Sequence, residues 1–161
     1  MEAAQARARL SGCRVARLAT ADASGRPHLV AITFAVAGDL IYTAVDHKPK
    51  TTRDLRRLRN IRENPRVSVL ADHYEEDWDR LWWVRADGRA RILGDPTECP
   101  GGHAGEDGGP GDVGESVEDM RRAAILLLVR RYDQYRVRPP DGPVIAIAVD
   151  RWSGWTASGV P

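Results

Sequence analysis

Lysine is almost absent from this chain of 161 residues. Lys48 and Lys50 are the only two, and arginine supplies the other basic side chains. Cysteine is equally scarce, and the wide separation of Cys13 and Cys99 excludes a disulfide framework and favours a reducing compartment. No apolar run is long enough to cross a bilayer, and the polar beginning of the chain lacks the apolar segment of a secretory signal. We therefore expect a cytoplasmic protein.

Several catalytic and binding motifs are also missing. The chain has no Walker loop, no glycine-rich dinucleotide fingerprint after a strand and no GxSxG elbow. Cys99 and His103 have a Cys-x₃-His spacing but no second pair of ligands, so we expect no metal site. No residue is assigned as catalytic, and an enzyme built from these parts would take its chemistry from a cofactor.

Positive charge is concentrated in one stretch. Residues 48–66 hold eight basic and two acidic side chains, a local charge of +6 in a chain whose net charge is +1. An acidic cluster at residues 72–79 supplies part of the balance. The chain lacks the overall basic footprint of a nucleic-acid-binding protein, so a local anionic ligand is the better match.

The two lysines flank Pro49, immediately before the arginine-rich stretch. Side chains two residues apart in extended backbone point the same way, so both ammonium groups can face one target. Pro49 favours that extended geometry, and Thr51 or Thr52 then opens a predicted helix whose free N–H groups attract an anion. The segment is predicted to hold a phosphate. A charged surface loop is the alternative.

The remaining pattern is that of a meander with interrupting helices. A short helix is expected up to about Cys13, and Ser116 with Asp119 forms a capping box for a helix of about twenty residues. A further helix is expected at 52–64, with Thr51 and Asp54 as its capping box. The predicted strands are residues 15–20, 28–36, 40–43, 67–71, 81–93 and 144–149, followed by an aromatic tail at 151–155.

Two features of this pattern are ambiguous. Asp87-Gly88 is either a hairpin turn or a bulge within one long strand, and the bulge is favoured. The glycine- and proline-rich stretch 94–114 is expected to be a flexible insert in a single domain spanning 1–161. Six or seven strands with two or three helices indicate an α+β barrel.

Tryptophan is the last clue, because Trp82 and Trp83 are adjacent on a predicted strand. Neighbouring strand residues face opposite sides, so only one of them can enter the core. The other is expected to face a groove, a ligand or a partner chain, and it could form a wall for a flat heteroaromatic ring. Packing in the core and at an interface is the alternative.

These segments together resemble the pyridoxamine 5′-phosphate oxidase-like split β-barrel proteins, in particular their deazaflavin (coenzyme F-420)-dependent branch of actinobacterial type. The resemblance rests on residues 15–20, Gly25-Arg26-Pro27-His28, residues 42–46, Lys48-Pro49-Lys50, residues 58–61, Asn64-Pro65-Arg66-Val67 and residues 88–91. It implies a six-stranded antiparallel split β-barrel with flanking helices, which forms a homodimer with cofactor sites at the subunit interface.

The resemblance also implies which residues bind the cofactor. Its phosphate would be held by Lys48 and Lys50, supported by Thr51 and Thr52. The ring system would lie beside Thr43 and Ala44, with Trp83 as a further wall. The basic path for the polyglutamate tail of F-420 would be formed by Arg53, Arg56 and Arg57.

The function expected from this resemblance is hydride transfer between reduced F-420 and a small unsaturated organic substrate. Tyr42 and His28 are unranked candidates for a proton donor. An FMN-dependent enzyme of the same fold and a non-catalytic deazaflavin carrier are alternatives. A regulator that binds nucleic acid through its arginine-rich helix is another, and it would show a steep salt dependence.

Overall fold

The computed structural model describes residues 1–45, 55–94 and 116–157. Its helices are α1 (Ala3–Gly12), α2 (Arg56–Glu63), α3 (Val117–Arg131) and α4 (Asp133–Val137), with a 3₁₀ turn, η1 (Trp78–Arg80). Its strands are β1 (Ala16–Ala21), β2 (Pro27–Ile32), β3 (Ala35–Ala37), β4 (Leu40–Ala44), β5 (Arg66–His73), β6 (Trp82–Leu93) and β7 (Val144–Thr156). None of the helices in this described part is long and apolar enough to span a membrane.

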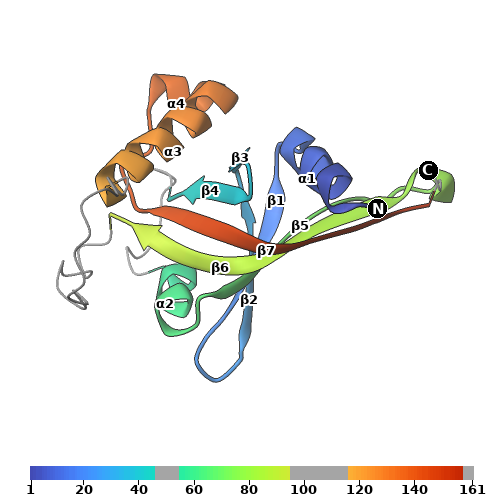
Figure 1. Ribbon diagram of the computed structural model, residues 1–161, viewed down its shortest axis with the longest axis horizontal. Helices are drawn as coiled ribbons and strands as arrows, with labels where there is room; N and C mark the ends of the chain where they lie inside the picture. The colour runs from blue at the N-terminus through green and yellow to red at the C-terminus, as the bar shows by residue number, and fades with distance from the viewer. Residues whose placement is uncertain (46–54, 95–115, 158–161) are drawn as a thin grey trace, which may run out of the picture.

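All strands belong to one antiparallel sheet in the order β2-β1-β5-β6-β7-β4-β3. The two edge strands, β2 and β3, are separated in the chain only by Thr33 and Phe34. Because so short a link joins opposite edges, the sheet must curl into a half-barrel (Figure 1). The α+β class is confirmed, and the architecture is consistent with the expected split barrel.

The part of the chain that the structure describes forms seven strands rather than six. The predicted strand 28–36 is divided at Phe34, whose side chain is fully buried and whose backbone turns away from the sheet ladder. The hydroxyl of Tyr132 takes over both backbone groups of Phe34, accepting from its N–H at 3.0 Å and donating to its carbonyl at 2.8 Å. A buried backbone group needs such a partner when it leaves a ladder.

Two groups of buried side chains lie on opposite sides of the sheet. The first fills the half-barrel and includes Leu10 of α1 and Ile61 of α2. The second lies between β4, β7 and the two C-terminal helices, and includes Leu128 of α3. Figure 1 shows α3 and α4 at one end of the sheet and α1 and α2 on either side of its middle.

The long strand β6 excludes a hairpin turn at Asp87-Gly88 and shows a β-bulge at this level of the sheet. It runs without a turn from Trp82 to Leu93. The register with β7 shifts at Asp87 and Gly88, which pair with Arg151 and Val149. Asp150 is therefore the extra residue, and the bulge lies in β7. A side chain at position 88 would meet backbone, since a Cβ there would lie 2.1 Å from the carbonyl oxygen of Ala148.

The last strand is longer than expected. The predicted strand 144–149 continues through the supposed aromatic tail to Thr156. The reason is that β6 offers backbone partners along its whole length, from Val144 opposite Leu93 to Thr156 opposite Trp82. The C-terminal residues therefore gain ladder hydrogen bonds that their own sequence pattern does not indicate.

The helix after residue 115 confirms its predicted cap but not its length. The Ser116 hydroxyl accepts a hydrogen bond from the Asp119 amide at 3.1 Å. The helix ends at Arg131, fifteen residues long, and Tyr132 is extended before α4 begins. The burial of Tyr132 against Phe34 explains why the helix stops there.

One part of the sheet's outer face is left uncovered. Among the described residues, α3 and α4 cover the part formed by β3, β4 and the adjoining end of β7. The other part, across β2, β1, β5 and the far ends of β6 and β7, has no helix over it. We call it the open sheet face, and its apolar side chains are Leu29, Leu70, Trp83 and Trp155.

Candidate functional site

The segment predicted to bind phosphate falls between β4 and α2. Lys48, Lys50, Thr51, Thr52 and Arg53 all lie outside the described residues. What the structure does describe is the beginning of α2, and it corrects one expectation: the helix starts at Arg56, not at Thr52. Leu55 has extended backbone angles and occupies the N-cap position, and the predicted capping box, Thr51 and Asp54, lies outside the described residues.

Thr43 and Ala44 end β4, immediately before that segment. Thr43 pairs with Ile145 and Ala44 with Val144, next to the end of β6. Both are buried, and Ala44 packs in the cluster beneath α3. They therefore mark the place where the chain leaves the sheet toward Lys48.

Arg57 lies near His28 of β2. His28 is half-buried, and its pKa is lowered from 6.5, first by burial and then by the positive charges of Arg56 and Arg57. A histidine with a lowered pKa is neutral at pH 7 and can both donate and accept a hydrogen bond. Of the two unranked proton-donor candidates, Tyr42 is instead packed inside the cluster beneath α3.

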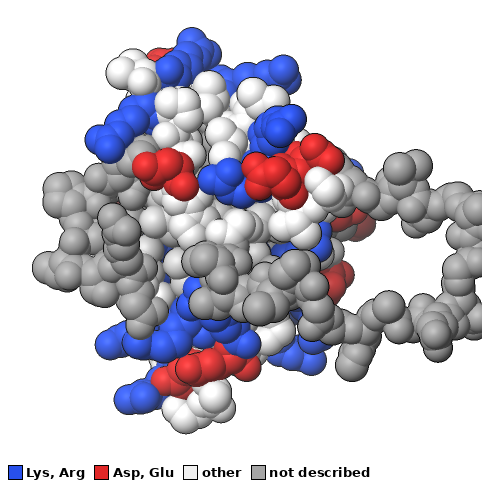
Figure 2. Space-filling view, turned by 90° about the vertical axis from the view of Figure 1, so that its left-hand side faces the viewer, with Lys and Arg blue, Asp and Glu red and all other residues white. Residues whose placement is uncertain are grey.

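A pocket of about 510 Å³ opens beside these residues, between the β1–β2 turn and α2. It is lined by Asp22, Arg26, Pro27, Arg56, Arg59, Asn60 and Glu63. Figure 2 shows Arg side chains in two areas of this side of the molecule, over α2 below and around α3 and α4 above. We call the arginines of α2, together with this pocket, the α2 basic face.

The β1–β2 turn is held rigidly against α2. The Asp22 carboxylate accepts hydrogen bonds from the Ser24 hydroxyl at 2.7 Å and from the Arg26 amide at 3.0 Å. These two interactions, in that order, are the main causes that lower the pKa of Asp22 to about 2. Glu63 of the helix accepts from the Ala23 amide at 3.2 Å. Asn60 is 2% exposed and donates to the Thr20 hydroxyl at 3.0 Å.

Trp83 lies on the open sheet face, far from the other candidate residues of the same chain. Its neighbours across the sheet are Asp72 of β5 and Trp155 of β7. Leu93, ten residues further along β6, is level with Ala44. At about 3.3 Å per residue, Trp83 is roughly 33 Å along the strand from that end. A single chain does not bring Trp83 together with Thr43 and Ala44.

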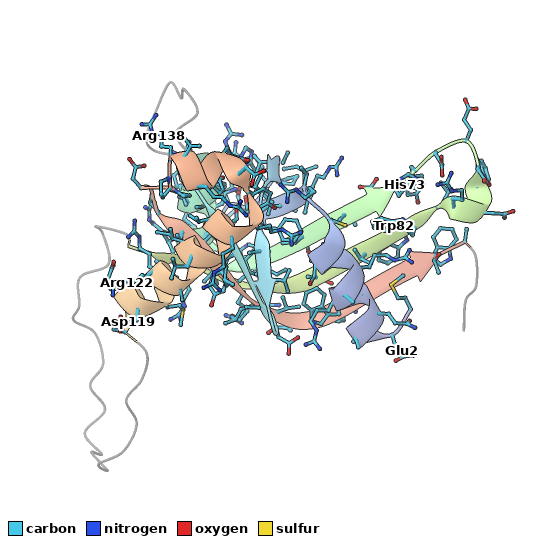
Figure 3. All side chains as sticks on the ribbon, turned by 90° about the horizontal axis from the view of Figure 1, so that it is seen from above. Glu2, His73, Trp82, Asp119, Arg122 and Arg138 are labelled. Carbon is cyan, nitrogen blue, oxygen red and sulfur yellow. The ribbon has the colours of Figure 1, made fainter. Side chains whose placement is uncertain are left out.

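Trp82 faces the other way, as the alternation predicts. It packs against the half-barrel core, beneath the Arg9 guanidinium of α1, which lies 5.1 Å from the ring centroid. His73 stacks beside it on β5, with ring centroids 6.3 Å apart, and Figure 3 shows the two labelled side chains on neighbouring strands. Trp82 therefore anchors α1 to the sheet.

Among residues 1–45, 55–94 and 116–157, no group of histidine, cysteine and carboxylate side chains could hold a metal ion. Cys99 and His103 lie outside those ranges. Cys13 is half-buried, and burial, the largest effect, raises the pKa of its thiol. Its Sγ donates to the Arg9 carbonyl at 3.3 Å, so the thiol is a hydrogen-bond partner for the last turn of α1.

The turn at residues 22–27 is predicted by the sequence, since an Asp two residues before a Ser commonly accepts hydrogen bonds from its own loop. Sequence reasoning missed the contact of this turn with Glu63 of α2 and the contribution of Asn60. Nothing in the pattern of the helix marked Asn60 as buried, because its partner, Thr20, is forty residues away.

Comparison with known proteins adds a family. A sequence model described as pyridoxamine 5′-phosphate oxidase matches residues 3–105. That range includes the first six strands of the sheet, α2 and the Lys48–Lys50 segment. A search of curated proteins finds no match.

Solved structures share the fold over nearly the whole chain. A conserved hypothetical protein from Mycobacterium tuberculosis has 23% identity and a TM-score of 0.65, with 100% of this chain and 89% of that chain covered. A FAD-binding protein from Mesorhizobium loti has 23% identity and a TM-score of 0.62, covering 96% and 94%. A heme storage protein from Vibrio cholerae has 16% identity and a TM-score of 0.60, covering 95% and 90%.

Proposed function

The chain belongs to the pyridoxamine 5′-phosphate oxidase family, and from this premise we propose that it is an oxidoreductase that uses the deazaflavin coenzyme F-420. When bound, this coenzyme accepts or delivers a hydride. The substrate we propose is a small unsaturated organic molecule. The single observation that carries the choice of cofactor is the α2 basic face, which follows directly on the Lys48–Lys50 segment.

The donor groups suit a long polyanion. Arg56 and Arg57 lie close enough to His28 to lower its pKa, so the helix creates a positive field at the edge of the sheet. We propose that Lys48 and Lys50, with Thr51 and Thr52, hold the cofactor phosphate. Arg53 and Arg57 would then carry the acidic tail. A single phosphate would need less positive charge than this stretch supplies.

The protein itself would bind the cofactor and the substrate, orient them and exclude water. We propose that β4 places the ring system at Thr43 and Ala44. His28 is a hydrogen-bond partner for the cofactor or the substrate, because a neutral imidazole can both donate and accept a hydrogen bond.

The distance of Trp83 from the end of β4 supports a homodimer. The open sheet face carries Leu29 at 64% exposure and Trp155 at 43%. Isolated exposed apolar residues are ordinary, but a set on one uncovered face marks an interaction surface. We propose that a second copy covers this face and that its Trp83 closes the cofactor site of the first copy.

The proposal is tested by titrating the purified protein with F-420 and, separately, with FMN and FAD, following fluorescence polarisation of each cofactor. We expect F-420 to bind more tightly than either flavin. Lys50→Ala should weaken F-420 by about 1.5–3 kcal/mol, since it removes a charge-assisted hydrogen bond. Arg122→Ala, on α3, is the matched control and should leave affinity unchanged.

A flavin is the second candidate, because the family name and the similar FAD-binding structure both point to flavins. Far tighter binding of FMN or FAD would replace the deazaflavin in our proposal. If F-420 binds but the reduced form passes no hydride to any of a panel of activated alkenes and nitroaromatics, the chain is a carrier. Unchanged affinity in Lys50→Ala would remove the proposed phosphate site.

A further inference from the structure

The pocket between the β1–β2 turn and α2 is built from parts that are already ordered. Asp22 fixes the turn through Ser24 and Arg26, and Glu63 ties the turn to the helix through the Ala23 amide. Gly25 sits in the turn with a φ of +81°, a conformation that glycine adopts without strain. A pocket with fixed walls loses little entropy when a ligand enters.

The lining of this pocket has a net positive charge, since it holds three arginines and two carboxylates. The Asp22 carboxylate is paired with Arg26 at 3.0 Å, and Glu63 accepts a hydrogen bond from the neutral Ala23 amide and keeps its negative charge. Arg56, by contrast, makes no hydrogen bond or ion pair with the residues that the structure describes. Arg59 lies three residues on, about 60° away around the helix, so both arginines line the same side. Arg56 and Arg59 therefore make this side of the pocket positively charged.

A buried polar side chain forms part of the lining. Asn60 is 2% exposed, yet it borders the pocket, and it is held by the Thr20 hydroxyl at 3.0 Å. An amide locked in this way offers a fixed polar group beside the arginines. A polar wall and guanidinium groups recognise oxygen-rich anions rather than apolar ligands.

We propose that this pocket binds a small organic anion with a terminal phosphate or carboxylate, held by Arg56 and Arg59 and bordered by Asn60. Its volume of about 510 Å³ is in the range of small-molecule sites and exceeds what a lone phosphate fills. The site shares Arg56 with the path expected for the acidic tail of the cofactor, but it contains none of the residues proposed to hold the cofactor phosphate. After burial, the charges of Arg56 and Arg57 also lower the pKa of the nearby His28.

The test uses the full chain labelled with ¹⁵N, including the arginine Nε–H groups, and two probes, inorganic phosphate and succinate. Chloride at equal ionic strength is the reference. We expect saturable shifts at the Ala23 and Asn60 amides and at the Nε–H of Arg56. Arg56→Gln should weaken binding about tenfold or more, and Arg59→Gln should do so independently.

Arg122→Gln is the matched control, an exposed arginine of α3 labelled in Figure 3, and should leave the affinity unchanged. Saturation by phosphate alone assigns a phosphate ligand, and saturation by succinate alone assigns a carboxylate. The same titration on Lys48→Ala/Lys50→Ala separates this site from the cofactor clamp, and the shifts should persist. Shifts that follow only ionic strength, survive both arginine variants, or vanish with the lysines overturn the proposal.

Discussion

The charge state of His28 depends on its burial and on two residues that follow it by almost thirty positions. Burial lowers the pKa of His28 most, and Arg56 and Arg57 of α2, which lie near its imidazole in the folded chain, act in the same direction. A histidine near cations loses its proton more readily. The side chain is thereby kept neutral where the candidate site needs a hydrogen-bond partner.

Replacing the two cations should raise the pKa of His28 part of the way to its ordinary value. We expect Arg56→Gln/Arg57→Gln to raise the pKa of His28 toward 6.5, because only the burial effect remains. The measurement is a pH titration of the histidine Cε1–H resonances, assigned with His28→Gln. Arg122→Gln serves as control. A pKa that stays unchanged in the double variant would show that the arginines do not act on this group.

The same shift has a consequence for stability. Because the pKa of His28 is lower in the folded chain than its ordinary value of 6.5, the unfolded chain takes up the proton first as the pH falls. The contribution of His28 is therefore complete above pH 6.5 and is lost as the pH falls through the folded-state value. In denaturant unfolding, the difference in the free energy of unfolding between the wild-type chain and His28→Gln should therefore change with pH below 6.5 and stay constant above it.

At the scale of elements, several boundaries are set by contacts between distant segments. The chain leaves β2 where Tyr132 binds the backbone of Phe34, and the same hydroxyl lies 2.9 Å from the Arg14 carbonyl. Arg131 adds a hydrogen bond of 2.6 Å to the Ser11 carbonyl. The end of α3 thus fastens α1 and the β2–β3 link together, which holds the two sheet edges near each other.

Tyr132→Phe removes the hydroxyl that makes these contacts and leaves the shape of the side chain almost unchanged. The amide and carbonyl of Phe34 would lose their shared partner in the core, so we expect a loss of about 1–3 kcal/mol in the free energy of unfolding. Urea unfolding followed by circular dichroism measures it. Tyr74→Phe is the control, because Tyr74 is 66% exposed. Equal stability of the two variants would contradict the role of the hydroxyl.

On the scale of the whole molecule, the curled sheet is covered unevenly. One half of its outer face is buried under α3 and α4, and the open sheet face is not. At the middle of that face, Asp87 accepts hydrogen bonds from Ser68 at 2.6 Å, Arg85 at 3.0 Å and Arg151 at 3.1 Å. Burial alone would raise the pKa of Asp87, but these donors outweigh it and lower the pKa. The charge is compensated within the chain, which suits a face that a partner covers.

A charge introduced on the open sheet face should separate the proposed dimer. Leu29→Arg would bury an uncompensated cation, at a cost of about 3–5 kcal/mol, enough to favour the monomer at micromolar concentration. Sedimentation velocity gives the assembly state. Val137→Arg, at a position of α4 that is 89% exposed, is the control. A Leu29→Arg chain that remains dimeric would exclude this face as the interface.

Local patterns predicted the parts of this fold whose partners are close in sequence. The alternation around Trp82 and Trp83, the unbroken strand through Asp87 and Gly88 and the Ser116 cap were all confirmed, because each depends on neighbouring residues. The division at Phe34 and the start of α2 were predicted wrongly, because the first depends on a distant tyrosine and the second on an extended Leu55. The candidate lysines lie outside the described residues and stay predictions.

The sequence by itself determined the class of fold and the place of the positive charge, because strand alternation and charge runs are local properties of the chain. Only the tertiary structure decided that Arg56 and Arg59 border one pocket with Asn60. It also decided that Trp83 lies on the open sheet face, level with Trp155 and distant from Ala44. These positions are set when the sheet curls, because Thr33 and Phe34 join its two edge strands. A local sequence pattern cannot predict which strands the curled sheet brings close together.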